Sequence, residues 1–278
     1  MPVILSAAFL ALGVLLAGSL PWGVLTYANQ RYASQWPWAV PVMMLYLGIY
    51  WQVVRGRWAP RDWSDDARVL VRANPLSVRL WPLALGAGLT GFLALLAMLS
   101  VMARLVAMPA GTAITMPVDM PVATVLMLLA MQSVVAGVTE ETAFRGYMQS
   151  LVEQRFGLMA AILANGTWFG LLHFSSHPGA VLLMLPYYIA VAAVYGGLTW
   201  ATNSILPAML LHVIGDVVVL WRWWVTSLPE WQLTDTPLPL LASSGVDREF
   251  MLAVVLTGLF SGITLVCYRL LHRKLAPA

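Results

Sequence analysis

Charged residues are scarce in this chain. Of its 278 residues only 10% are Asp, Glu, Lys or Arg, whereas 60% are hydrophobic. A soluble domain could not bury so large an apolar fraction, and runs of about 20 apolar residues recur along the chain, as in helices that span a bilayer. A membrane β-barrel is disfavoured because its strands would alternate over about 10 residues. We therefore predict an all-α fold: a polytopic membrane protein with about eight transmembrane helices in one bundle.

Cysteine and clustered basic residues are also rare. The single cysteine, Cys267, leaves no partner for an intramolecular disulfide and no basis for a Cys-rich metal site. The net charge of +3 comes from short basic loops, without the Lys/Arg array that binds nucleic acid. The expected partners are therefore the lipid bilayer and molecules within it, and not nucleic acid.

Eight apolar runs are predicted to form the spans of one integral membrane domain covering residues 1–278. No basic segment precedes the first run and no convincing cleavage site follows it, so we expect it to be retained as a helix. By the positive-inside rule the arginine-rich loop 55–79 and the basic tail at 272–274 are cytoplasmic, and so are both termini. The predicted spans are residues 2–20, 40–54, 80–106, 122–155, 158–174, 180–202, 206–225 and 250–271.

Glycines and prolines suggest three local features. Gly86, Gly88 and Gly91, near the start of the third span, predict close contact between helices. The fourth apolar run is too long for one straight span, and Gly137 is the candidate for a break in it. The Trp/Pro-rich link 227–247 is a candidate surface flap.

The segment Thr139–Tyr147 places two carboxylates and a guanidinium inside this apolar background. An ionisable group within a bilayer costs at least ~2.5–3.5 kcal/mol, so such a cluster predicts a functional site. On a helix, Glu141 and Arg145 are four residues apart and can form a supporting ion pair, whereas Glu140 is rotated by ~100° and is free for chemistry. The alternative is an ion-pair network that only holds helices together.

Two of the four histidines, His173 and His212, also lie within predicted spans. If Phe156-Gly157 is the tip of a helical hairpin, Glu140 precedes it and His173 follows it at similar depth, ~24–26 Å from the tip. His212 and Asp216 are four residues apart and share a helix face. One buried histidine is often only a hydrogen-bonding residue between helices. Four reactive groups on three helices instead predict a catalytic site made of Glu140, His173, His212 and Asp216.

These side chains suit peptide-bond hydrolysis. A carboxylate and an imidazole that share a water can remove its proton during attack on a carbonyl, while a second imidazole stabilises the oxyanion. A serine nucleophile is less attractive because neither Ser133 nor Ser175 sits in a nucleophile-elbow pattern. No His-Glu-x-x-His motif is present, and no cofactor is expected. Zinc remains the alternative, with Glu140, His173, His212 and Asp216 as its ligands.

Three motifs in order carry a family resemblance: Glu140-Glu141-x-x-x-Arg145, Phe169-x-x-x-His173 and His212-x-x-x-Asp216. Together they resemble the motifs of the CPBP (CAAX protease and bacteriocin-processing, Abi) family, which includes the type II CAAX prenyl endopeptidase. The resemblance covers about Val122 to Leu220.

The resemblance implies an intramembrane protease of about eight helices. In it, Glu140 and His173 would activate water, while His212 and position 216 would form the oxyanion site. Asp216 stands where the prenyl endopeptidases have Asn. An ionised Asp would repel an oxyanion, so Asp216 must be protonated, orient His212 or bind a metal.

The predicted function is that of an intramembrane endopeptidase acting on membrane-anchored or lipid-modified peptides or proteins. The abundance of bacterial members in the family makes a bacterial cell membrane the expected location. One alternative is a non-catalytic immunity or scaffold protein with the same fold, and a second is an ion-coupled transporter. Intact motifs favour the enzyme over the scaffold. The chain also lacks paired broken helices in two similar halves, which disfavours the transporter.

Overall fold

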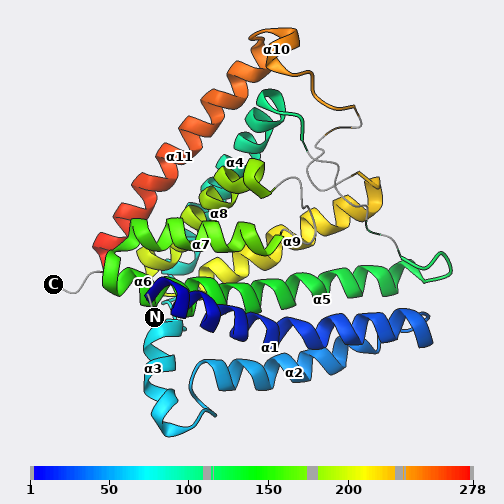
Figure 1. Ribbon diagram of the computed structural model, residues 1–278, viewed down its shortest axis with the longest axis vertical. Helices are drawn as coiled ribbons and strands as arrows, with labels where there is room; N and C mark the ends of the chain where they lie inside the picture. Colours follow the sequence, from blue (N-terminus) through cyan, green and yellow to red (C-terminus); the bar gives the residue numbers. More distant parts are fainter. Residues whose placement is uncertain are drawn as a thin grey trace.

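The computed structural model describes residues 3–108, 114, 116–173, 181–228, 234 and 236–275. Every regular element in these ranges is helical (Figure 1). The elements are α1 Val3–Tyr32, α2 Ala39–Val54, α3 Arg61–Val71, α4 Leu80–Leu105, α5 Val122–Glu140, η1 Glu141–Met148, α6 Gln149–Phe156, α7 Leu158–Leu172, α8 Val181–Thr202, α9 Leu206–Thr226, α10 Leu241–Ser244 and α11 Arg248–Leu275.

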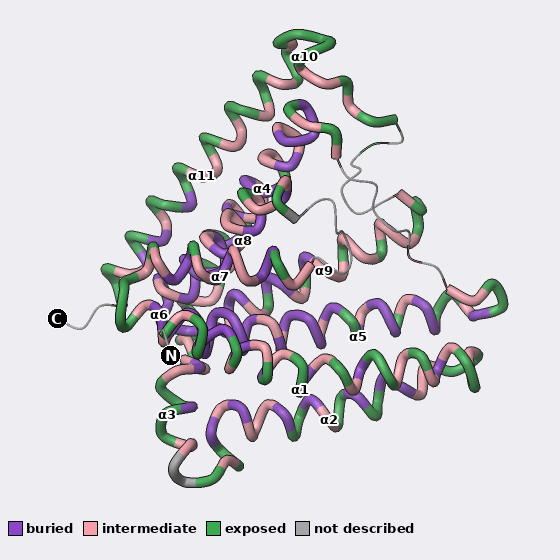
Figure 2. Tube along the Cα trace, in the orientation of Figure 1, coloured by how far each residue is buried: buried purple, intermediate pink, exposed green. Residues whose placement is uncertain are grey.

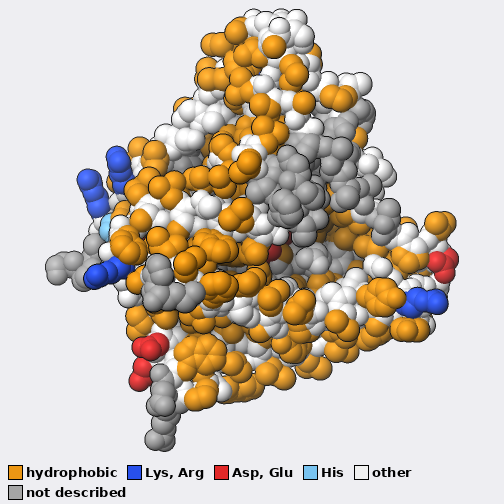
Figure 3. Space-filling model, viewed as in Figure 1, with side chains coloured by type: hydrophobic (Ala, Val, Ile, Leu, Met, Phe, Trp, Pro, Cys, Tyr) orange, Lys and Arg blue, Asp and Glu red, His pale blue; other side chains and the backbone are white. Residues whose placement is uncertain are grey.

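The described helices make the chain a polytopic membrane bundle. Six helical segments are long and apolar enough to cross a membrane, and the continuous segment Val122–Phe156 is one of them. The shorter apolar helices α2 and α7 supply the other two of the eight apolar runs, so the predicted fold class is confirmed. Apolar side chains cover much of the molecular surface in Figure 3, as a lipid environment requires.

The first turn of α1 and the last turn of α11 lie at the same end of the molecule, near α3 and α6 (Figure 1). From there α1, α2 and α5 run side by side, whereas α4 and α11 diverge from them. Figure 2 shows burial concentrated along α5, while α11 is largely exposed. The buried apolar residues form two clusters, one around α5 and η1 that includes Leu128 and Tyr147, and one of α4, α8, α9 and α11 that includes Leu198 and Tyr268.

Helix α1 is longer than predicted because polar side chains hold its second half. It continues through Pro21 to Tyr32, beyond the predicted end at residue 20. Trp22 donates its indole N–H to Gln132 Oε1 of α5 at 2.8 Å. Asn29 is fully buried and donates to the carbonyls of Ala33 and Trp36. These contacts satisfy polar groups at the turn between α1 and α2, so the helix persists to that turn.

The arginine-rich loop 55–79 contains a helix that the sequence analysis did not anticipate. α3 buries Ala67 and Val71 on one face and keeps charged residues on the other. Arg72 directly follows α3, and its φ of 51° turns the chain. The Arg72 guanidinium binds Glu153 of α6, with Nη2 2.9 Å from Oε2. α3 therefore packs beside the end of the bundle as an amphipathic helix.

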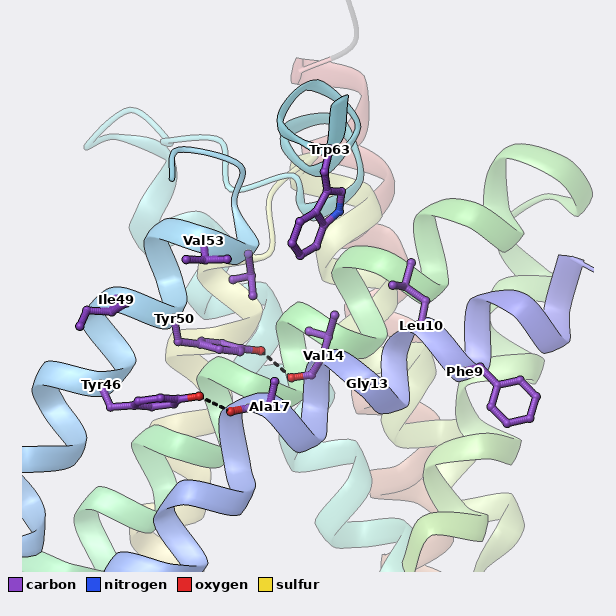
Figure 4. Close-up of a pocket in the computed structure, with 11 residues that line it drawn as sticks. Phe9, Leu10, Gly13, Val14, Ala17, Tyr46, Ile49, Tyr50, Val53 and Trp63 are labelled. Atoms are coloured by element: carbon purple, nitrogen blue, oxygen red, sulfur yellow. Dashed lines mark hydrogen bonds between the residues drawn. The ribbon is translucent and has the colours of Figure 1, made fainter. Parts of the chain in front are cut away.

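An apolar groove of about 430 Å³ lies between α1 and α2, with Trp63 of α3 at one end (Figure 4). Tyr46 and Tyr50 cross from α2 and donate their hydroxyl hydrogens to the carbonyls of Ala17 and Val14, at 2.6 and 3.0 Å. The tyrosines thereby fix the spacing of the two helices while leaving the groove walls apolar.

At the far end of α4, Arg104 joins this helix to the segment before α11. Its side chain is only 3% exposed and makes a bidentate contact with Asp247, at 3.1 Å from Nη1 to Oδ1 and 2.6 Å from Nη2 to Oδ2. It also donates to the Pro239 carbonyl and the Ser244 hydroxyl. Arg104 therefore holds residues 239–247 of the candidate flap against α4. Residues 229–233 and 235 lie outside the described residues.

This contact predicts a pH-dependent stability. Hydrogen bonds from Arg104 hold the pKa of Asp247 below its usual value. A carboxyl with a lowered folded-state pKa stabilises the fold above its unfolded pKa of about 3.9, and this contribution is lost as pH falls through the folded pKa. Asp247→Asn should therefore lower the unfolding temperature by a few degrees at pH 6, and the difference from wild type should shrink below about pH 4. Thermal unfolding in detergent at several pH values measures it. A constant difference would contradict the ion-pair explanation.

Candidate active site

The site is built where the segment Val122–Phe156 changes its helical geometry. Glu140 is the last residue of α5 and Glu141 the first of η1, a π-helical stretch of eight residues. A π-turn widens the helix and re-aims its side chains, and such turns occur often at functional sites. Every residue from 141 to 150 is buried. The predicted irregularity in this segment is therefore real, but it is a change of pitch after Gly137 and not a break at it.

Gly137 has another role, because it lets α9 approach α5. A Cβ atom there would lie 2.5 Å from Val213 Cγ2 and 3.2 Å from the Met209 carbonyl oxygen, too close for any larger residue. His212 of α9 is thereby brought beside Glu140 and Glu141. Gly88 and Gly91 of α4 allow the close contacts predicted for them, whereas no neighbour lies within 4 Å of a Cβ at Gly86.

The helical hairpin predicted at Phe156-Gly157 is present. α6 ends at Phe156 and α7 begins at Leu158, with only Gly157 between them. Gly157 has a φ of 83°, a conformation that glycine adopts without steric cost. His173 follows the last residue of α7 and interacts electrostatically with Glu140. The hairpin thus returns the chain toward Glu140, with His173 within electrostatic range of it.

His212 is the centre of the site and faces three carboxylates. Its Nδ1 lies 2.8 Å from Glu141 Oε1, while its Nε2 lies 3.5 Å from Asp216 Oδ2 and 3.8 Å from Glu140 Oε2. A carboxylate oxygen accepts, so the Nδ1 contact requires a hydrogen on Nδ1. Both ring nitrogens of His212 face acidic groups. His212 therefore connects Glu141, the carboxylate predicted to be structural, with Glu140 and Asp216, which are predicted to take part in the reaction.

Accessibility separates these carboxylates into two kinds. The side chains of Glu140 and Asp216 are 22% and 33% exposed, so water can reach them. Glu141 is completely buried and Arg145 is 1% exposed. The predicted ion pair between them forms, with Arg145 Nη1 3.2 Å from Glu141 Oε1. The site therefore has a buried ion pair on one side and two solvent-accessible carboxylates on the other.

Aromatic rings enclose the buried guanidinium. The Arg145 Cζ atom lies 5.4 Å from the ring centroids of both Phe169 and Tyr195, within range of cation–π attraction. Tyr195 also packs against His212, with 5.3 Å between ring centroids. Phe169 belongs to the motif that ends at His173, but no spacing signal in the sequence marked Tyr195 of α8.

The His173 ring is held in one orientation. Its Nδ1 lies 2.8 Å from the Phe169 carbonyl oxygen, and a carbonyl only accepts, so Nδ1 carries the hydrogen in this contact. The ring also packs against Phe169 and Tyr188, with centroid separations of 4.7 and 4.8 Å. In the neutral ring, Nε2 is therefore the atom with a free lone pair.

The other candidate groups have different surroundings. The hydroxyl of Ser133 is completely buried and donates to the Leu129 carbonyl at 3.0 Å, which leaves it unsuited to nucleophilic attack. Ser175 lies outside the described residues. Within the described ranges, no group of three or more His, Cys, Asp or Glu side chains is arranged to hold a metal ion.

One family model matches the segment of the chain that holds this arrangement. Residues 122–218 match the family model described as type II CAAX prenyl endopeptidase Rce1-like. This matched segment resembles the CPBP family, as its motifs indicated. It contains all six residues predicted for the site, and it coincides with the segment over which the motifs resemble that family. No curated protein and no solved structure matches the chain.

Proposed function

We propose that the protein is an intramembrane endopeptidase that hydrolyses peptide bonds of membrane-anchored or lipid-modified substrates with a water molecule activated by Glu140 and His173. One observation carries the proposal: partly exposed Glu140 and Asp216 meet two histidines inside an apolar helix bundle. Three membrane helices converge there on groups that are costly to place in a bilayer. The match of residues 122–218 to a family of prenyl endopeptidase-like proteins supports the same reaction class.

The two water-activating groups have complementary roles in this proposal. His173 offers the lone pair of Nε2, since its Nδ1 is engaged with the Phe169 carbonyl. Glu140 is accessible, and its carboxylate accepts a second hydrogen bond from the same water. As the water oxygen attacks the scissile carbonyl carbon, one of these groups takes the proton and later returns it to the leaving amine.

His212 is assigned to the developing oxyanion. Because its Nδ1 hydrogen points to Glu141, its Nε2 donates to an oxyanion only when the ring carries both protons. Asp216, 3.5 Å from Nε2, is assigned to orienting the ring. An uncharged Asn at position 216 would keep a polar contact to His212 and add an N–H donor. This assignment explains how Asp is tolerated where related proteins have Asn.

The proposed reaction is tested by isotope incorporation. The purified protein, reconstituted in liposomes prepared in ¹⁸O-labelled water, is incubated with a panel of peptides. Some carry a C-terminal lipid and others a transmembrane anchor, with unanchored versions as controls. Mass spectrometry should find one ¹⁸O in the new carboxyl group of an anchored peptide. If no anchored peptide is cut, the result would favour the interpretation as a non-catalytic scaffold or immunity protein. Substrate-independent proton flux into the liposomes would favour a transporter.

Metal removal separates the two mechanisms that these residues permit. We expect active protein to contain no stoichiometric zinc and to keep its activity after chelator treatment. We also expect Asp216→Asn to retain activity within about tenfold, because the amide can still contact His212 and can donate to an oxyanion. Elemental analysis, chelation and readdition of zinc measure the metal dependence, and cleavage rates measure the effect of Asp216→Asn. Zinc whose removal and return switch activity off and on would assign Glu140, His173, His212 and Asp216 to a metal site instead.

A further inference from the structure

A second groove lies where the first turns of α4 meet the last turns of α11. It has a volume of about 350 Å³ and is lined by Leu83, Cys267, Leu270, Leu271, Arg273 and Lys274. Four of these residues form an apolar trough, and the other two are cations. A lining that changes from apolar to cationic along one helix matches the chemistry of an anionic amphiphile.

The two helices run antiparallel, which adds a third cation to the groove. Leu83 of α4 faces Leu270 and Leu271 of α11, whereas Arg104 at the other end of α4 binds Asp247 just before α11. Arg79, which directly precedes α4, is therefore level with the last turn of α11. It is exposed, as are Arg273 and Lys274. Figure 3 shows Lys and Arg side chains at this end, at the edge of an apolar surface.

The side of α11 opposite the groove is held by contacts with α8, so these contacts fix the position of its last turns. Tyr268 donates its hydroxyl hydrogen to the Val194 carbonyl of α8 at 2.8 Å. His272 stacks on Trp200 of α8, with 3.9 Å between ring centroids and 15° between planes. With these residues turned toward α8, the groove residues face α4 and the bilayer. Trp200 also marks the level of the interface, where tryptophan is enriched in membrane proteins.

Among the described residues, the three cations at this groove have no acidic partner. Within the described ranges, no ion pair joins Arg79, Arg273 or Lys274 to an acidic side chain. Unpaired Lys and Arg beside a lipid-facing groove attract anionic headgroups, at about 1 kcal/mol or fivefold in affinity per cation. We propose that this groove binds one anionic phospholipid, with an acyl chain against Leu83 and Leu270 and its phosphate at Arg273, Lys274 and Arg79.

Native mass spectrometry of the full chain in a neutral detergent tests the site. Phosphatidylglycerol is titrated against phosphatidylcholine and against inorganic phosphate. We expect one phosphatidylglycerol to bind at least tenfold more tightly than phosphatidylcholine, and phosphate alone to bind far more weakly. Arg273→Gln/Lys274→Gln should weaken the phosphatidylglycerol complex by about 25-fold. Leu270→Trp, which fills the trough, should weaken both lipid complexes.

A matched variant controls for general attraction between cations and lipid. Arg57→Gln/Arg155→Gln removes two exposed arginines outside the groove and should leave phosphatidylglycerol binding within about twofold. Equal losses in the two double variants would overturn the proposal in favour of diffuse attraction. Equal affinity for the two lipids would also overturn it, and so would phosphate binding as tightly as phosphatidylglycerol, which would indicate an anion site without a lipid tail.

Discussion

Glu140→Gln is expected to lower the turnover rate by about 10²–10⁴-fold without loosening the fold. The amide keeps the shape of the side chain but cannot take a proton from water. The substitution should not disturb packing, because the Glu140 side chain is 22% exposed and lies 3.8 Å from His212 Nε2, beyond hydrogen-bond distance. Initial cleavage rates and thermal unfolding of the same purified samples measure the two effects.

Two further variants are compared with Glu140→Gln in this experiment. His173→Ala should reduce turnover to a similar extent, since it removes the Nε2 lone pair assigned to the same water. Glu153→Gln is the matched control, because Glu153 is a carboxylate in the same continuous helical segment but pairs with Arg72 away from the site. It should keep wild-type turnover. Full turnover by Glu140→Gln would refute the proposed water activation.

The sequence predicted the parts of the fold that depend on local pattern. Within the described residues, apolar runs located six long hydrophobic helical segments and two shorter apolar helices, and Phe156-Gly157 marked the tip of the hairpin between α6 and α7. The spacing of four residues likewise predicted the pair formed by Glu141 and Arg145. In each case one helix, or one short hairpin, determines the geometry.

Features that depend on contacts between distant helices were not predicted. The hydrogen bond from His212 to Glu141 exists because α9 approaches α5 at Gly137, and no spacing within one helix encodes that approach. The π-helical pitch of η1 and the position of Tyr195 beside Arg145 also arise from tertiary packing. As a result, Glu141 was expected to be only a structural partner of Arg145, whereas it also fixes the orientation of His212.

This double role of Glu141 leads to a prediction about stability. Glu141→Gln and Arg145→Ala should each destabilise the protein by ~3–5 kcal/mol, because removing one member of a buried ion pair leaves the other charge without its partner. Both side chains are at most 1% exposed, so water cannot compensate. Arg145→Ala also loses the contacts with Phe169 and Tyr195. Reversible unfolding in mixed micelles measures the changes.

A double variant separates the ion pair from the contact with His212. Glu141→Leu/Arg145→Met replaces both charges by apolar groups of similar size and should recover most of the lost stability. It should not recover activity, because His212 Nδ1 would have lost the oxygen atom 2.8 Å away that orients it. If instead both single variants unfolded like wild type and were inactive, Glu141 would be the chemical carboxylate. The roles given to Glu140 and Glu141 would then have to be exchanged.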